Sequence, residues 1–235
     1  MIDKKRWIIV FIFALAMAWM ESATVVYLRT LVNRIEPYQA TPLPVSVGLG
    51  QTEIVREAAT LIMLLTVGLL AGRTWRSRLA YAMIAFGVWD MFYYVFLAVI
   101  TGWPRSIMDW DVLFLIPLPW WGPVLSPVLI ALLLVIGGTL VSQFDRPDRP
   151  IWPGWKAWVF NLSGVALALY VFMADAVQRA SHGAEAVRQS LPATFNWPLF
   201  GLALILLAVP IFQVLGQIDR HRQQRPEAVT VVIAE

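Results

Sequence analysis

The sequence predicts an all-α polytopic membrane protein with six transmembrane helices and one shorter half-helix on the outer side. Of its 235 residues, 59% are hydrophobic and 14% are charged, against roughly 45–50% and 25% in soluble domains. Six apolar segments each approach the roughly 20 residues that a helix needs to cross the hydrocarbon core of a bilayer. Basic residues also concentrate in alternate connecting segments, as they do in the cytoplasmic loops of membrane proteins.

The six apolar segments are expected to form one transmembrane bundle over residues 1–218, followed by a short cytoplasmic tail over 219–235. The predicted spans are residues 7–31, 53–72, 79–101, 122–143, 155–177 and 197–217. The second is the least apolar, because Glu53, Arg56 and Glu57 occupy its first turns. The first begins like a signal peptide, with basic residues before an apolar run. That run continues to Val32, so we expect a retained helix.

The charges of the connecting segments predict the orientation. If the N-terminus lies inside, twelve basic residues fall on the inner side and six on the outer side. The inner ones are Lys4, Lys5, Arg6, Arg73, Arg76, Arg78, Arg146, Arg149, Lys156, Arg220, Arg222 and Arg225. Because positively charged loops stay in the cytoplasm, both termini are predicted to be cytoplasmic. Contact with anionic lipid headgroups explains the basic pI, so we expect the bilayer as the partner and no nucleic acid.

Composition also limits the cofactors. The chain has no cysteine, which excludes iron–sulfur ligation, disulfides and cysteine catalysis. Its two histidines, His182 and His221, fall on opposite sides of the predicted bundle, which argues against haem. No lysine lies deep within a predicted span, which argues against a retinal Schiff base. The identity of any other cofactor stays open.

The connection between the third and fourth spans, residues 101–121, is expected to contain the half-helix, over about 106–116. Ser106 and Asp109 have the spacing of a helix start, and Pro117 ends the segment. Such a helix would be about 16 Å long, half the thickness of a membrane. Because residues 112–116 are too apolar for water, we expect a re-entrant or interfacial position on the outer side.

Acidic side chains in the outer half of the bundle need an explanation. Four different segments supply them: Glu21, Glu53, Glu57, Asp90, Asp109 and Asp111. Four of these lie in first turns of predicted helices, where the helix dipole favours acids. Glu21 and Asp90 lie well inside their spans, where an acid costs roughly 2.5–3.5 kcal/mol and therefore needs partners from other helices. They indicate either a functional site or a buried hydrogen-bond network.

The six acids form a candidate proton- or cation-binding site. We expect Arg56 to hold Glu57 ionised, and Tyr93 or Tyr94 to donate hydrogen bonds. Carboxylates near tyrosines, without histidine, suit hard cations such as Ca²⁺, Mg²⁺ or Mn²⁺. Close acids in a medium of low dielectric constant also cannot all ionise, so at least one is expected to hold a proton. The sequence does not choose between a proton and a cation, or between transport and a metal centre.

Four phrases in the first half of the chain resemble a family of bacterial multispan inner-membrane proteins of uncharacterised activity. They occupy residues 19–29 (WMESATVVYLR), 56–60 (REAAT), 86–94 (FGVWDMFYY) and 110–120 (WDVLFLIPLPW). The resemblance covers roughly residues 5–135. It implies a location in the bacterial inner membrane and no particular activity.

The leading hypothesis is therefore an outward-opening site built by Glu21, Glu57 and Asp90, with the 101–121 connection as its gate. One alternative is a non-catalytic subunit that packs against a larger membrane complex. Its acids would then form buried hydrogen bonds or contacts with the partner. Another is a membrane enzyme that acts on a lipid or a quinone.

Overall fold

Six long helices dominate the structure, a computed structural model that describes residues 3–39, 47–114, 118–183 and 194–223. They are α1 (Lys4–Leu31), α2 (Val47–Ala71), α3 (Trp75–Thr101), α4 (Leu125–Phe144), α5 (Trp155–Arg179) and α7 (Trp197–Gln223). Each contains a stretch long and apolar enough to cross a membrane, which confirms the six predicted spans. The protein is thus an integral multispan membrane protein. Helix α7 continues to Gln223, into the predicted tail, and residues 224–235 lie outside the described part.

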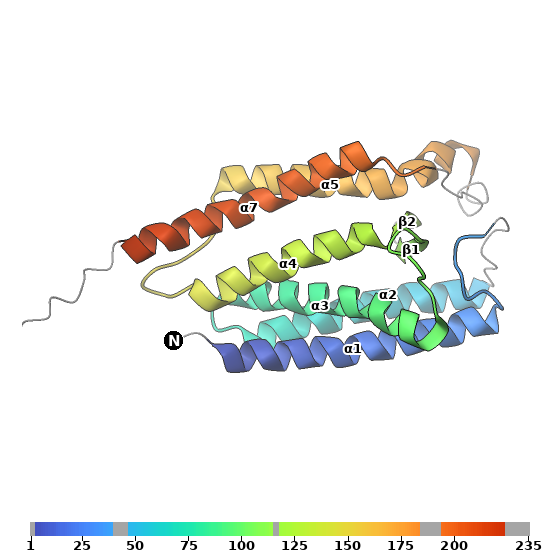
Figure 1. The fold of residues 1–235 in the computed structure, drawn as a ribbon, viewed down its shortest axis with the longest axis horizontal. Helices are drawn as coiled ribbons and strands as arrows, with labels where there is room; N and C mark the ends of the chain where they lie inside the picture. The colour runs from blue at the N-terminus through green and yellow to red at the C-terminus, as the bar shows by residue number, and fades with distance from the viewer. Residues whose placement is uncertain (1–2, 40–46, 115–117, 184–193, 224–235) are drawn as a thin grey trace, which may run out of the picture.

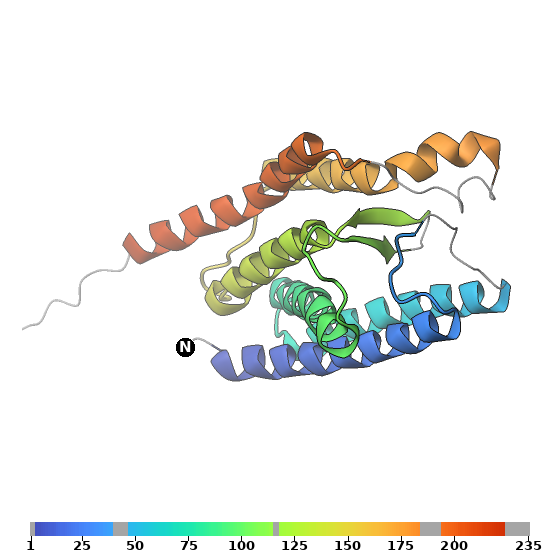
Figure 2. The ribbon, with the colours of Figure 1, turned by 45° about the vertical axis from the view of Figure 1, so that its right-hand side comes forward.

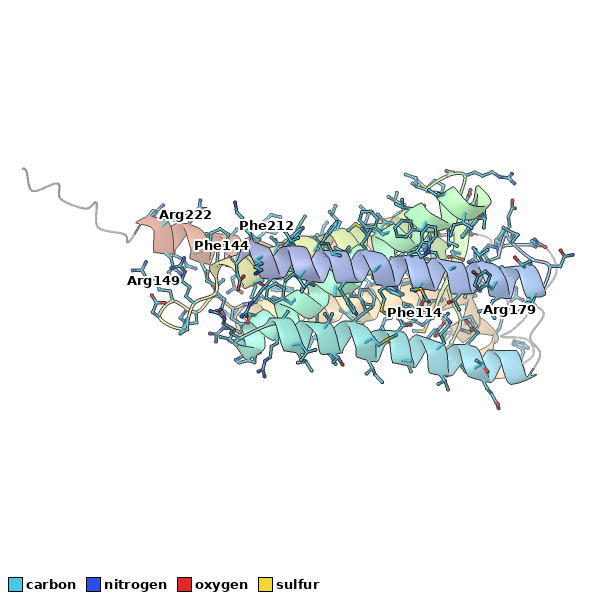
Figure 3. All side chains as sticks on the ribbon, turned by 90° about the horizontal axis from the view of Figure 1, so that it is seen from below. Phe114, Phe144, Arg149, Arg179, Phe212 and Arg222 are labelled. Carbon is cyan, nitrogen blue, oxygen red and sulfur yellow. The ribbon has the colours of Figure 1, made fainter. Side chains whose placement is uncertain are left out.

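The helices form two groups joined through α4. Helix α3 packs against α1, α2 and α4, while α5 packs against α7, which also contacts α4; Figures 1 and 2 show this arrangement. We call the end where α1 finishes the hairpin end, and the end where α1 begins the N-terminal end. In Figure 3, Arg149 and Arg222 lie at the N-terminal end, and Phe114 and Arg179 lie toward the hairpin end.

Helix α3 is the central helix of the first group and has well-defined ends. At its start, the Thr74 side chain accepts a hydrogen bond from the Ser77 backbone N–H, and the Ser77 side chain accepts one from the Thr74 backbone N–H. Together they make a capping box. At its finish, Gly102 takes a left-handed conformation with φ 73°, which glycine adopts without a steric penalty. These caps fix the length of α3 and the depth at which its middle residues lie.

Glycines bring α3 and α4 into close contact. A Cβ atom on Gly87 would lie 2.5 Å from the Ala131 carbonyl oxygen, and one on Gly138 would lie 2.5 Å from the Ala80 carbonyl oxygen. Only a residue without a side chain allows this approach. Small residues at helix contacts are typical of membrane bundles, in which close packing replaces much of the hydrophobic effect.

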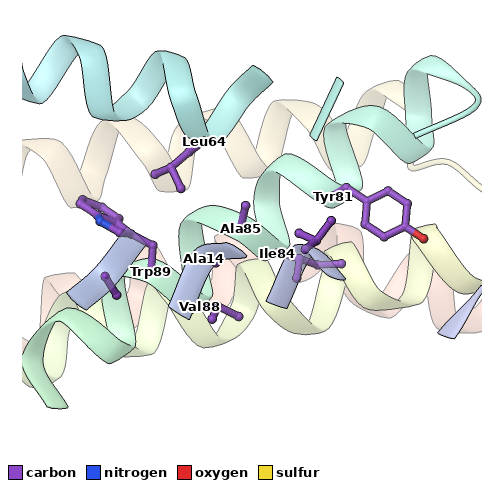
Figure 4. Packing of buried hydrophobic residues seen from close by; sticks show 9 residues of the cluster. Ala14, Leu64, Tyr81, Ile84, Ala85, Val88 and Trp89 are labelled. Atoms are coloured by element: carbon purple, nitrogen blue, oxygen red, sulfur yellow. The ribbon is translucent and has the colours of Figure 1, made fainter. Parts of the chain in front are cut away.

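The core of the first group lies between α1, α2 and α3 (Figure 4). Its buried members are Val10, Ala14, Ala18, Leu64, Tyr81, Ile84, Ala85, Val88 and Trp89. Large apolar side chains also cover the outside of the bundle. Examples are Leu70 on α2, 81% exposed, and Phe212 on α7, 69% exposed and labelled in Figure 3. A surface of this kind is stable against lipid rather than water, so these faces contact the bilayer.

The expected half-helix is wrong: the connection after α3 is a β-hairpin. Strand β1 (Trp110–Phe114) pairs antiparallel with β2 (Trp120–Pro123), and Asp111 lies opposite Gly122. The carboxylate of Asp109 accepts hydrogen bonds from the backbone N–H groups of Arg105 and Ser106, at 2.7 and 3.1 Å, and so closes a turn instead of starting a helix.

The residues after that turn favour a strand. Trp110, Val112 and Phe114 are aromatic or β-branched and alternate with period two, which suits a pleated strand with a partner. Pairing of residues 120–123 also moves the start of α4 to Leu125, from the predicted 122. Residues 115–117 of the predicted half-helix lie outside the described part.

Candidate functional site

A cavity of about 230 Å³ lies between α1, α2, α3 and β1. Of the six acids predicted from the sequence, Glu21, Glu53, Glu57 and Asp90 line it. Asp111 lies fully buried in β1 next to the lining residue Val112. Asp109 belongs to the turn described above and does not line the cavity, so its predicted place among the site residues gains no support.

Helix α3 supplies one wall of the cavity through Trp89, Asp90, Tyr93 and Tyr94. Residues that follow at i, i+1, i+4 and i+5 share one face of a helix, which is why four lining residues come from two adjacent turns. Trp89 stacks on Tyr93 with ring centroids 6.5 Å apart. Helix α1 is tied to the same region, because the Ser22 hydroxyl donates a hydrogen bond to the Tyr93 carbonyl oxygen at 3.0 Å.

Arg56 joins α2 to α1 across the cavity. Its Nε and Nη2 atoms donate to Oε2 of Glu53 at 2.9 and 2.8 Å, and its Nη1 atom pairs with Glu21. The Thr60 hydroxyl adds a hydrogen bond to Oε2 of Glu21 at 3.3 Å. The expectation that Glu21 needs a polar partner from another helix is therefore confirmed.

The ion pairs of Arg56 are with Glu53 and Glu21, and the effect expected from Arg56 on Glu57 stays a prediction. Residues three apart lie on the same side of a helix, whereas adjacent residues point in different directions. Glu53 is therefore in reach of Arg56 along α2. Glu21 completes the contact from α1 because the two helices flank α3 at this level.

Arg29 and Asp111 form a second ion pair, which sequence reasoning missed. Nη2 of Arg29 lies 2.8 Å from Oδ1 of Asp111, and the guanidinium group also lies over the ring of Trp103, 4.5 Å from its centroid. This pair joins the last turn of α1 to strand β1. An arginine at the end of one span and an acid in a loop are the only signal for it in the sequence.

Asp111 is in an unusual position for a carboxylate. It is fully buried, and its Oδ2 atom has no hydrogen-bond partner among the described residues. Burial raises the pKa of the Asp111 carboxyl above its usual value, although Arg29 and the Val112 backbone N–H act in the opposite direction. Arg29 and Asp111 form an ion pair, so Arg29 is engaged by Asp111 and forms no ion pair with another acid of the described chain.

Asp90 differs from the other acids of the cavity. It lies in the middle of α3 and is 9% exposed. No described group hydrogen-bonds or forms an ion pair with its carboxyl. Within the part of the chain that the structure describes, Tyr93 and Tyr94 line the cavity without a hydrogen bond to Asp90, and the hydrogen bonds expected from these tyrosines to the site stay a prediction.

The lining as a whole is acidic. Four carboxylates and the two guanidinium groups of Arg29 and Arg56 face the cavity, so its fully ionised lining has a formal charge of −2. Within the described ranges, no three His, Cys, Asp or Glu side chains are grouped closely enough to hold a metal ion.

Comparison with known proteins adds no further evidence. No family model, curated protein or solved structure matches the chain. The multispan architecture that the family resemblance implied is confirmed by the six helices, while the family itself is not identified.

Proposed function

We propose that the cavity is an intramembrane proton-binding site and that Asp90 is the residue that takes up the proton. The observation that carries this proposal is the setting of Asp90: a nine-tenths buried carboxyl, halfway along a membrane helix, that lines a cavity and has no partner in the described chain. An acid at this depth is retained when it is paired, hydrated or functional. Asp90 is not paired, and the cavity gives it access to water.

Charged groups from three elements surround Asp90. They are Glu21 and Arg29 on α1, Glu53, Arg56 and Glu57 on α2, and Asp111 on β1. Arg56 is held between two glutamates and Arg29 is held by Asp111, so neither cation is available to balance an ionised Asp90. In a medium of low dielectric constant, an uncompensated charge beside other acids is costly, and a bound proton removes that cost.

A proton fits this site better than a hard metal cation. Calcium takes six to eight oxygen ligands, and magnesium needs near-octahedral geometry. Glu21, Glu53 and Asp111 each already pair with an arginine, and no metal-binding group of three is found among the described residues. A proton needs only one carboxyl.

The cavity is proposed to open to the outside of the cell. The basic residues of Figure 3 at the N-terminal end, Arg149 and Arg222, belong to the cytoplasmic side under the charge rule for membrane loops. The hairpin end, with the cavity, is then on the outer side. In a bacterial inner membrane, this side faces the more acidic compartment, which suits a site that takes up protons.

Proton titration of the purified protein tests this proposal. At neutral pH, the wild-type protein and the Asp109→Asn control are expected to hold one more carboxyl proton than Asp90→Asn, because Asp109 does not line the cavity. Each variant must first unfold at a temperature close to that of the wild type. Equal proton counts for the wild type and a folded Asp90→Asn variant would contradict the assignment.

A further inference from the structure

We infer that the same cavity binds a small organic ammonium ion, which exchanges with the proton on Asp90. This inference rests on the proposed function, since it takes Asp90 as the exchanging group. The shared chemistry is an amine, either free in solution or on a lipid headgroup. The argument uses the charge of the cavity, its aromatic walls and its volume.

The charge of the cavity favours a cation. Arg56 is neutralised by two carboxylates, so the Glu21–Arg56–Glu53 group keeps one negative charge when ionised. Arg29 and Asp111 cancel one another. Glu57 is a further acid of the lining. Asp90 adds another negative charge once its proton leaves, and it has no partner among the described residues. A cation in the cavity would therefore have a counter-ion that no side chain of the described chain competes for.

The walls favour an organic cation over an inorganic one. Trp89, Tyr93, Tyr94 and Phe114 all line the cavity, together with aliphatic residues of α1 and β1. Aromatic rings attract ammonium groups through the negative charge of their faces, and the attraction is stronger where water is excluded. A carboxylate beside several aromatic rings is the arrangement that recognises substituted ammonium ions. A strongly hydrated metal ion gains less from such walls.

The volume is sufficient for the ligand. About 230 Å³ is room enough for a small alkylammonium ion with bound waters. The part of a lipid that this chemistry would recognise is its headgroup amine. Binding displaces the carboxyl proton: the ammonium ion enters with its charge, Asp90 ionises, and one proton is released to water. The charge of the cavity stays constant through this exchange.

The binding test uses the full chain in nanodiscs of phosphatidylglycerol, a lipid without an amine. Methylammonium and tetramethylammonium are titrated by calorimetry at constant ionic strength, with sodium as the reference cation. We expect saturable binding, release of about one proton for each ion bound, and weaker binding at lower pH. Asp90→Asn should abolish the binding. Phe114→Leu should weaken it roughly three- to tenfold through the lost cation–π contact, whereas Phe212→Leu, on the lipid-facing side of α7, should leave it unchanged.

A second set of nanodiscs, which contains phosphatidylethanolamine, distinguishes the source of the amine. If phosphatidylethanolamine competes with methylammonium, the occupant is the lipid headgroup; if methylammonium binds equally well in both lipids, the occupant is a free amine. Either result supports the inference. Absence of both binding and competition would overturn it, as would binding that persists in a folded Asp90→Asn variant. A protein that holds the Asp90 proton but binds no ammonium would refute this inference alone, and ammonium binding without proton release would refute the proton assignment.

Discussion

At the scale of single residues, the buried pair of Arg29 and Asp111 connects the end of α1 to the hairpin. The side chain of Asp111 is 1% exposed and that of Arg29 is 13% exposed. Removing one member of such a pair leaves the other charge buried and uncompensated. Arg105 and Glu36 form an exposed ion pair, with side chains 77% and 44% exposed. Removing one member of this pair leaves the other charge in contact with water.

Arg29→Gln should therefore lower the free energy of unfolding by about 3–5 kcal/mol. The matched variant Arg105→Gln should change it by less than about 1 kcal/mol, because exposed pairs are screened by water. Equilibrium unfolding in mixed detergent micelles measures both. Similar losses for the two variants would mean that the buried pair does not hold the hairpin in place.

Predictions for single residues from the sequence hold where the depth of a residue in the membrane decides which contacts it needs. The position of Glu21 inside a span requires a partner from another helix, and Arg56 and Thr60 of α2 supply it. The partner of Asp111 is not predictable in this way. Arg29 is 82 positions away in the sequence, and the contact depends on how the hairpin folds back over α1.

At the scale of elements, the packing of α3 against α4 determines where the wall of the cavity lies. Gly87 and Gly138 allow the two backbones to approach, and so place the face of α3 that holds Asp90. The six helices are predictable from the length of the apolar segments in the sequence. The hairpin is not predictable in this way: residues 110–114 alternate as a strand does, but an apolar run of this length also fits a short helix, and pairing with residues 120–123 decides between them.

Gly138→Ala should destabilise the protein by about 1–3 kcal/mol, because the new methyl group would overlap the Ala80 carbonyl oxygen. Gly216→Ala is the control: a Cβ atom there meets nothing within 4 Å, so alanine should be neutral or slightly stabilising in α7. Thermal unfolding of the two purified variants, measured side by side, tests this difference. A tolerated Gly138→Ala would argue against the close approach of α3 and α4.

At the scale of the whole molecule, the six spans and the alternation of basic loops are readable from the sequence because the bilayer imposes length and charge rules. The cavity is not readable, because it depends on the way α1 and α2 both flank α3. The sequence brings the acids to one half of the bundle, and the packing separates Asp109 from Glu21, Glu53, Glu57 and Asp90.

The orientation has a direct test, since the chain contains no cysteine to give a background signal. Single cysteines at Ile107, near the hairpin, and at Arg149, at the N-terminal end, mark the two ends of the bundle. A membrane-impermeant maleimide should label Ile107→Cys in intact cells and label Arg149→Cys only after permeabilisation. The reverse pattern would place the cavity on the cytoplasmic side.

Infrared spectroscopy gives the most direct test of the central claim, that Asp90 holds a proton inside the membrane. A protonated carboxyl has a C=O stretching band that an ionised carboxylate lacks. Burial shifts this band away from the bands of exposed carboxyl groups. At neutral pH, this band should be present in the wild type and in Asp109→Asn, and absent in Asp90→Asn. A band of equal intensity in Asp90→Asn would assign the proton to another acid, and no band in the wild type would show that the cavity holds no protonated carboxyl.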